Sequence, residues 1–260
     1  MSTADGGARI AAIGADGAPG GWAAACLRAS SLEDKESLRW TTELRLFASI
    51  ADLAEFRVGD AADAPICIDV PIGLLDSVGY RPCDIKAREI LGPTRASSVF
   101  MAPARYMLAA AGDYPAIRRL VEQERKDNPS ARGLSAQSAG IAPKVKEVDE
   151  WVRAHPESHE WFFECHPELS FHALVGGDIP YAKSSAAGAG LLSRLRILKP
   201  VFRDAEERIA SAPWPAKLVG LSDLLDAYAA LATAIACARG VQQTLGGGRD
   251  SENVPMQMAI

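Results

Sequence analysis

Five acidic residues of this sequence have types and spacings that could form a metal site. Asp16, Asp69 and Glu164 each follow a short apolar run, and Asp223 and Asp226 begin a long apolar stretch near the end. A carboxylate at the end of a buried strand is costly unless a cation, a proton or hydrogen bonds compensate it. Several such acids together are typical of magnesium-dependent cleavage of phosphodiesters.

The elements that must position these acids are strands and one helix. The apolar residues before Asp69 and the Val-Pro after it predict a buried strand over 66–70. The runs before Asp16 and Glu164 have the same form. If these strands are parallel, their carboxyl ends open onto one crevice, which would bring the acids together.

The first 70 residues predict three strands, a helix and a fourth strand. The three strands span 8–16, 22–29 and 38–47, with a glycine-rich hairpin turn after the first. Ser49 is the predicted N-cap of the helix that follows. This opening order is that of the ribonuclease H fold, a mixed α/β sheet, and differs from the strict alternation of a doubly wound sheet.

The remaining chain predicts mostly helices. Residues 74–158 form a mainly helical insertion within a single domain of residues 1–260. Predicted helices span 84–91, 114–125 and 145–154 in the insertion, and 184–198, 201–210 and 227–240 after the strand 161–164. Ser222 is the expected N-cap of the last helix and Gly240 its stop. Gly246–Arg249 is expected to be a flexible link.

Composition limits the class of protein. The chain has 260 residues, 48% hydrophobic and 23% charged, as is ordinary for a soluble globular protein. No uninterrupted apolar run of membrane-spanning length and no secretion signal are visible. The five cysteines are scattered without a Cys-x-x-Cys pair, which favours reduced thiols over a disulfide framework or a zinc site. We therefore expect a cytoplasmic protein.

The charge argues against a protein that coats nucleic acid without regard to sequence. The net charge is -5, and the insertion holds 13 basic against 11 acidic residues. Scattered basic residues could still contact phosphate oxygens of a bound substrate, although each could equally be a surface ion pair. These candidates are Arg95, Arg105, Lys144 and Lys183.

Several ordered motifs resemble those of the domain of unknown function 429 family, whose members are predicted to be ribonuclease H-like nucleases. The matching segments are 14–22, 68–74, 81–88, 97–103, 133–137, 143–149, 164–168 and 223–227. They cover most of the chain in one order. The resemblance implies the fold more directly than the reaction, because the activity of the family is itself mainly inferred.

The resemblance also implies roles for the five acids. Asp16 and Asp69 would bridge Mg²⁺ or Mn²⁺, Glu164 and Asp226 would be outer ligands, and Asp223 would orient a reactant or act as a base. Two such ions about 3.5–4 Å apart can hold both the attacking and the leaving oxygen of a phosphodiester. The helical pair is similar in position to the acidic pair of Holliday-junction resolvases. Nucleic acid is the substrate that this implies.

Each acid also has an ordinary structural explanation. Asp16 could serve the glycine-rich turn, and Asp69 could cap a loop. Glu168 or His166 could be the functional member of the run that contains Glu164.

The helical acids have ordinary explanations as well. Asp223 could be a helix-start acid favoured by the helix dipole, and Asp226 could lie on a solvated face.

Two other functions are open on the sequence. An ATP-using member of the wider fold, related to actin and sugar kinases, would need hydroxyl groups in the loop after the first strand. That loop is Gly-Ala-Pro-Gly-Gly, without serine or threonine. The other alternative is a binding module that kept the fold without catalysis.

Overall fold

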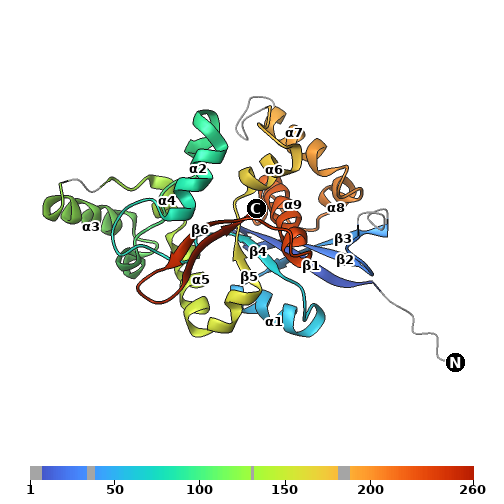
Figure 1. Ribbon diagram of the computed structural model, residues 1–260, viewed down its shortest axis with the longest axis horizontal. Coiled ribbons are helices and arrows are strands. Elements are labelled where there is room, and N and C mark those ends of the chain that lie inside the picture. The colour runs from blue at the N-terminus through green and yellow to red at the C-terminus, as the bar shows by residue number, and fades with distance from the viewer. Residues whose placement is uncertain (1–7, 34–38, 130–131, 181–187) are drawn as a thin grey trace.

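A five-stranded mixed sheet forms the centre of the protein. The computed structural model describes residues 8–33, 39–129, 132–180 and 188–260. The strands of the sheet are β1 (Arg9–Ala18), β2 (Gly21–Ala29), β3 (Thr41–Phe47), β4 (Ile66–Asp69) and β5 (Phe162–Glu164). Their order is β3-β2-β1-β4-β5, as Figure 1 shows. The predicted mixed α/β class is confirmed.

The first three strands form the predicted meander. β2 pairs antiparallel with β1 on one side and with β3 on the other. β4 then lies beside β1 and parallel to it, and β5 lies parallel to β4. The third strand begins at Thr41, and residue 38 of its predicted span lies outside the described residues.

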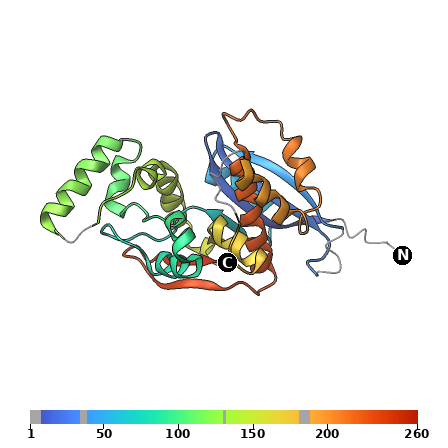
Figure 2. The ribbon, with the colours of Figure 1, turned by 90° about the horizontal axis from the view of Figure 1, so that it is seen from above.

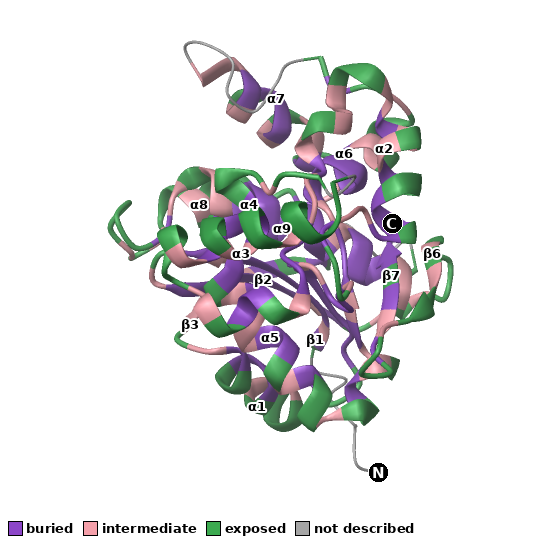
Figure 3. Cartoon of the chain, turned by 90° about the vertical axis from the view of Figure 1, so that its left-hand side faces the viewer, coloured by how far each residue is buried: buried purple, intermediate pink, exposed green. Residues whose placement is uncertain are grey.

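Helices cover both faces of the sheet, which is why β1 and β2 are buried almost throughout. One face packs against α1 (Ile50–Asp60) and α5 (Ala142–Ala154). The other face packs against α9 (Leu221–Ala238), with α6 (Pro167–Val175), α7 (Ala189–Leu198) and α8 (Ala205–Ala210) around it. Figure 3 shows the buried residues concentrated in the strands and in the helical surfaces that face them.

The insertion between β4 and β5 contains helices joined by loops, and no strand among its described residues. It contains α2 (Pro82–Arg95), η2 (Ala96–Ser98), η3 (Arg105–Ala110), α3 (Tyr114–Asp127), α4 (Ala136–Gly140), α5 and η4 (Pro156–Glu160). α3, α4 and η3 share a small apolar cluster of their own. Figure 2 shows α3 at the edge of the molecule, away from the sheet.

Local signals explain where two helices begin. Ser49 is the N-cap of α1, where it accepts a hydrogen bond from Asp52 N, as predicted. Ser222 is not the N-cap of α9, and this prediction is wrong. Gly220 occupies that position, and its N–H donates to Asp223 Oδ2 at 2.8 Å. The hydrogen bond from Gly220 N to the Asp223 carboxylate therefore stabilises the start of α9.

The C-terminal segment forms a hairpin that the sequence did not predict. β6 (Thr244–Arg249) pairs antiparallel with β7 (Pro255–Ala259), and Ala259 forms a parallel bridge with Cys165 just after β5. Gly246–Arg249 is therefore part of a strand, and its interpretation as a flexible link is wrong. A side chain at Gly246, where φ is 82°, would collide with the backbone of Cys83, so close packing explains the glycine.

Within the part of the chain that the structure describes, one helix, α9, has the length and apolar composition to cross a membrane, and 61% of its residues are buried inside the protein. It packs directly on β1 at Gly14, where a β-carbon would lie 1.9 Å from Leu231 N and 2.3 Å from Ala227 O. Helix backbone and strand backbone therefore meet with no space for a methyl group. This contact aligns the helix with the strand end.

We expect Gly14→Ala to destabilise the protein by about 3 kcal/mol or more, because neither backbone can yield without losing its hydrogen bonds. Chemical denaturation would measure the change. Gly59→Ala is the matched control, since no atom lies within 4 Å of its added β-carbon. That variant should be neutral or stabilised by about 0.5–1 kcal/mol, as alanine favours a helix over glycine. Equal stability of the two variants would contradict the packing described here.

Candidate active site

A pocket of about 970 Å³ opens at the carboxyl ends of the parallel strands β1, β4 and β5. The ends of these strands and the first turns of α6 and α9 line it on one side. Three parts of the insertion also line it: Arg81 and Asp84 at the start of α2, the segment 94–100 at and after its end, and Gln137 to Lys144 on α4 and α5. The site therefore lies between the sheet and the helical insertion.

Asp16 and Asp69 come together at this sheet edge. The parallel register of β1 and β4 pairs the two residues directly. Because paired residues on neighbouring strands point to the same face, both side chains leave the sheet on the same side. Asp16 is 8% exposed, and its Oδ1 accepts a hydrogen bond from Gly17 N at 2.7 Å. The predicted juxtaposition of these two aspartates is confirmed.

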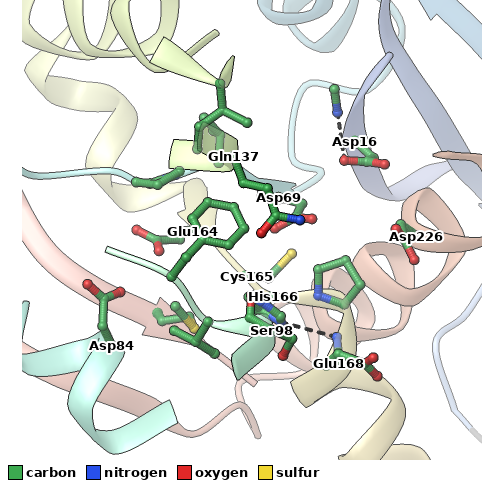
Figure 4. A pocket seen from close by; sticks show the side chains of 18 of the residues that line it. Asp16, Asp69, Asp84, Ser98, Gln137, Glu164, Cys165, His166, Glu168 and Asp226 are labelled. Carbon is green, nitrogen blue, oxygen red and sulfur yellow. Dashed lines mark hydrogen bonds between the residues drawn. The ribbon is translucent and has the colours of Figure 1, made fainter. Parts of the chain in front are cut away.

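Asp226 is brought to the same side by α9. This is the face on which Gly14, two residues before Asp16, touches the helix. Asp226 lines the pocket and is only 3% exposed, so it does not lie on a solvated face. Figure 4 shows Asp16, Asp69 and Asp226 around one space, from β1, β4 and α9 respectively.

Glu164 does not join these three acids. The register of β5 places it opposite Ile68, one residue before Asp69. Adjacent residues of a strand point to opposite faces, so Glu164 leaves the sheet on the other side. In Figure 4, Glu164 and Asp84 lie on one side of Asp69, and Asp226 lies on the other. Glu164 therefore lines the same pocket from the opposite face of the sheet, and its expected role as an outer metal ligand stays a prediction.

A buried arginine occupies the space beside Glu164. The Arg81 guanidinium binds both oxygens of Glu164, at 2.5 and 2.7 Å, and both oxygens of Asp84, at 2.7 and 3.1 Å. Glu164 also accepts Ile72 N at 2.7 Å. Burial alone would lower the pKa of Arg81, but the charges of Glu164 and Asp84 raise it well above its ordinary value.

This ion-pair group also contains the one set of possible metal ligands that lies within 4.8 Å among the described residues. The set is Cys83, Asp84 and Glu164, all buried. Because Arg81 binds both carboxylates, the group forms a structural clamp that joins α2 to β5.

Asp223 has a structural role at the start of α9. Its two carboxylate oxygens accept Gly220 N at 2.8 Å and Ser222 Oγ at 3.1 Å. It is not one of the described residues that line the pocket, whereas Ser222 and Asp226 are. Asp223 therefore caps α9 outside the pocket lining, and its expected catalytic role stays a prediction.

Glu168, an alternative that the sequence left open, does line the pocket. Arg194 Nη2 donates to its Oε1 at 2.5 Å, while its buried Oε2 has no hydrogen-bond partner among the described residues. Figure 4 places Glu168 on the same side of Asp69 as Asp226. Glu168 is thus better placed than Glu164 to supply a fourth carboxylate.

His166 is the N-cap of α6. Its Nδ1 accepts Glu168 N at 3.2 Å, so the proton is on Nε2, which donates to Ser98 O at 3.3 Å. Burial lowers the pKa of His166, which keeps the ring neutral. Both ring nitrogens are engaged, so His166 holds the segment 97–100 against α6.

Two of the four predicted basic residues line the pocket. Lys144 Nζ donates to Gly21 O at 2.7 Å and lies 4.4 Å from the centre of the Trp22 ring. Burial lowers the pKa of Lys144, while Glu147 and Asp16 act to raise it. Arg95 also lines the pocket, and its Nη2 donates to Ile179 O at 2.9 Å.

The structure does not place the other two basic residues at the pocket. Arg105 pairs with Asp149 at 2.5 Å and with Asp250, and it is not one of the described residues that line the pocket. It ties the insertion to the C-terminal hairpin, which agrees with the ion-pair alternative for this residue. Lys183 lies outside the described residues.

The model of the family described as "Protein of unknown function (DUF429)" matches residues 14–250. The chain belongs to this family. No curated protein and no solved structure matched the chain. The DUF429 match includes the three clustered aspartates and Glu168, and it extends to the end of β6.

Within the DUF429 span, sequence reasoning missed Arg81, Asp84 and Arg194. The pair Arg81 and Asp84 had a usable signal, because an acid three residues after a helix start is typical of a capping box. Arg194 had none, since nothing near it in sequence indicates that its partner is Glu168, 26 residues away.

Proposed function

We propose that the protein is a ribonuclease H-like nuclease that cleaves phosphodiester bonds of nucleic acid with Mg²⁺ or Mn²⁺. The observation that carries this proposal is the in-register pair Asp16 and Asp69, with Asp226 on the same face of the same pocket. Three carboxylates from three separate elements converge there. Bringing three carboxylates together destabilises the folded state through charge repulsion and desolvation unless positive charge compensates them.

The topology supports the proposed fold. A three-strand antiparallel meander precedes α1, and β4 then lies adjacent and parallel to β1. This is the arrangement expected of a ribonuclease H-like sheet, and the DUF429 family is predicted to share it. The helical insertion enters between β4 and β5, where it can form one wall of the site without disturbing the strands.

The donor set fits a hard divalent cation. Asp16, Asp69 and Asp226 offer only carboxylate oxygens, which Mg²⁺ and Mn²⁺ prefer. Glu168 could add a further oxygen from α6. When bound, such a cation would stabilise the charge that develops on a phosphodiester during hydrolysis.

The chain's own residues would position the substrate. Lys144 is held beside Asp16 by Gly21 O and Trp22, so a cationic group stands next to the carboxylates. Arg95 and Ser97 line the opposite wall. These groups could donate hydrogen bonds to phosphate oxygens. We place this activity in the cytoplasm, as the composition suggests.

Metal-linked stability tests the proposal. Saturating Mn²⁺ should raise the thermal midpoint of the wild type, because it binds only the folded arrangement of the acids. A hundredfold excess over Kd corresponds to about 2.7 kcal/mol, or roughly 5–10 °C for a chain of this size.

The matched pair of variants is Asp69→Asn and Asp223→Asn. The substitution is chemically the same, but Asp69 lines the pocket and Asp223 caps α9. Asp69→Asn should lose the response to Mn²⁺, and Asp223→Asn should keep it from a lower starting midpoint. A wild-type midpoint that Mn²⁺ does not change, or equal responses of both variants to Mn²⁺, would contradict the proposed metal site.

A further inference from the structure

Three of the five cysteines lie together between the sheet and α9. The Sγ atoms of Cys67 on β4 and Cys237 near the end of α9 are 3.6 Å apart. Cys165, next to the end of β5, is within hydrogen-bonding reach of Cys67. All three belong to the apolar cluster that joins α9 to the sheet. Two sulfur atoms at 3.6 Å need to approach by about 1.5 Å to form a disulfide.

The three thiols differ in their exposure. Cys67 and Cys165 are buried, with 0% and 1% of their surface exposed, whereas Cys237 is partly exposed. A small oxidant in solution can therefore reach Cys237 first. The hydrogen bond with Cys67 lowers the pKa of Cys237, which favours its thiolate. Cys237 is thus placed to react first with an oxidant, and Cys67 is placed to react with the oxidised Cys237 as the resolving thiol.

We infer that Cys237 and Cys67 form a dithiol that hydrogen peroxide converts to a disulfide between α9 and β4. In the first step the Cys237 thiolate attacks peroxide, an S–O bond forms, the O–O bond breaks and hydroxide leaves. In the second step the Cys67 sulfur attacks Cys237, the S–S bond forms and the S–O bond breaks. The departing hydroxide takes the Cys67 proton as water. The two sulfurs lose two electrons, which reduce the peroxide to water.

The cross-link would join the two elements that carry Asp69 and Asp226. Cys67 precedes Asp69 by two residues and faces the same side of the sheet, toward α9. The disulfide would connect positions 170 residues apart in the chain. Closing so long a loop restricts the unfolded chain strongly. Oxidation should therefore stabilise the fold and hold α9 against β4, whether or not the site is a nuclease.

Thiol counting on the intact protein tests this inference. The reduced protein has five titratable thiols after denaturation, and brief treatment with hydrogen peroxide should leave three. The mass should fall by two hydrogens, and peptide mapping should recover the 67–237 cross-link. The thermal midpoint should rise by roughly 5–15 °C and return when dithiothreitol is added.

Two serine variants separate this pair from the other thiols. Cys237→Ser should keep all four remaining thiols under the same treatment, and its midpoint should not rise. Cys83→Ser, which changes a buried cysteine on α2, should still lose two thiols. Loss of two thiols in Cys237→Ser, or five thiols retained by oxidised wild type, would overturn the inference. If Cys237→Ser does not fold, a wild-type peptide map without a 67–237 link would overturn it.

Discussion

Asp69→Asn is expected to lower metal-dependent cleavage of nucleic acid by at least about 10²-fold while the fold stays intact. Asparagine keeps the size of the side chain but removes the charge that would hold the cation. Loss of groups that only support a metal ligand already costs about 10–100-fold, so loss of a ligand should cost more. Asp16→Asn should behave in the same way, because the register pairs the two residues.

The assay requires a panel of single-stranded, duplex, hybrid and branched substrates with Mn²⁺. Asp226→Asn should approach the loss of Asp69→Asn, and Asp223→Asn should retain most of the activity because Asp223 caps α9 outside the pocket. Cleavage that survives in purified Asp69→Asn would indicate a contaminating nuclease. A wild type that is inactive on every substrate but hydrolyses ATP would contradict the proposed function and favour the kinase-like alternative.

Arg81→Met is expected to destabilise the protein by about 3–5 kcal/mol. The substitution leaves two buried carboxylates, Glu164 and Asp84, without the cation that now binds all four of their oxygens. Removing one partner of a buried ion pair leaves an uncompensated charge, which accounts for the size of the effect. Urea denaturation at neutral pH would measure it as a lower midpoint.

Arg118→Met is the matched control, because Arg118 forms an exposed pair with Glu122 at 3.4 Å. Such a pair contributes about 0–1 kcal/mol, so its loss should be small. An equally small effect of Arg81→Met would show that the clamp does not support the fold.

The pH dependence of Arg81→Met follows from the same cause. Burial raises the pKa of Glu164, and removal of Arg81 takes away the main opposing charge. A carboxyl group whose pKa is raised in the folded state does not oppose folding at low pH, where it is protonated in both states. It destabilises the folded state as the pH rises above the pKa that the group has in the unfolded chain. The stability deficit of the variant should therefore shrink between neutral pH and about pH 5.

The pairing of Asp16 with Asp69 was predictable because both residues end short apolar strands. Two parallel strands that lie side by side place their carboxyl ends at one edge, whatever surrounds them. The helix that carries Asp226 was predictable for a similar reason, since its apolar composition requires burial. Here local pattern and tertiary structure agree.

The fate of Glu164 was not predictable in the same way. Its position at the end of a strand resembles that of Asp69, but the pairing of β5 with β4 is offset by one residue. An offset of one residue turns every side chain of a strand to the opposite face. The buried partner Arg81, 83 positions away, then makes Glu164 part of a structural clamp.

By itself, the sequence determined the mixed α/β class, the order of the central strands, the helical insertion and the presence of acids at strand ends. These features depend on local periodicity, capping and apolar burial, which neighbouring residues specify. Only the tertiary structure decided that Glu164 leaves the sheet opposite Asp16 and Asp69, that Arg81 pairs with Glu164 and Arg194 with Glu168, and that Cys67 lies against Cys237. These outcomes depend on strand register and on contacts between distant segments, and no local pattern encodes either of them.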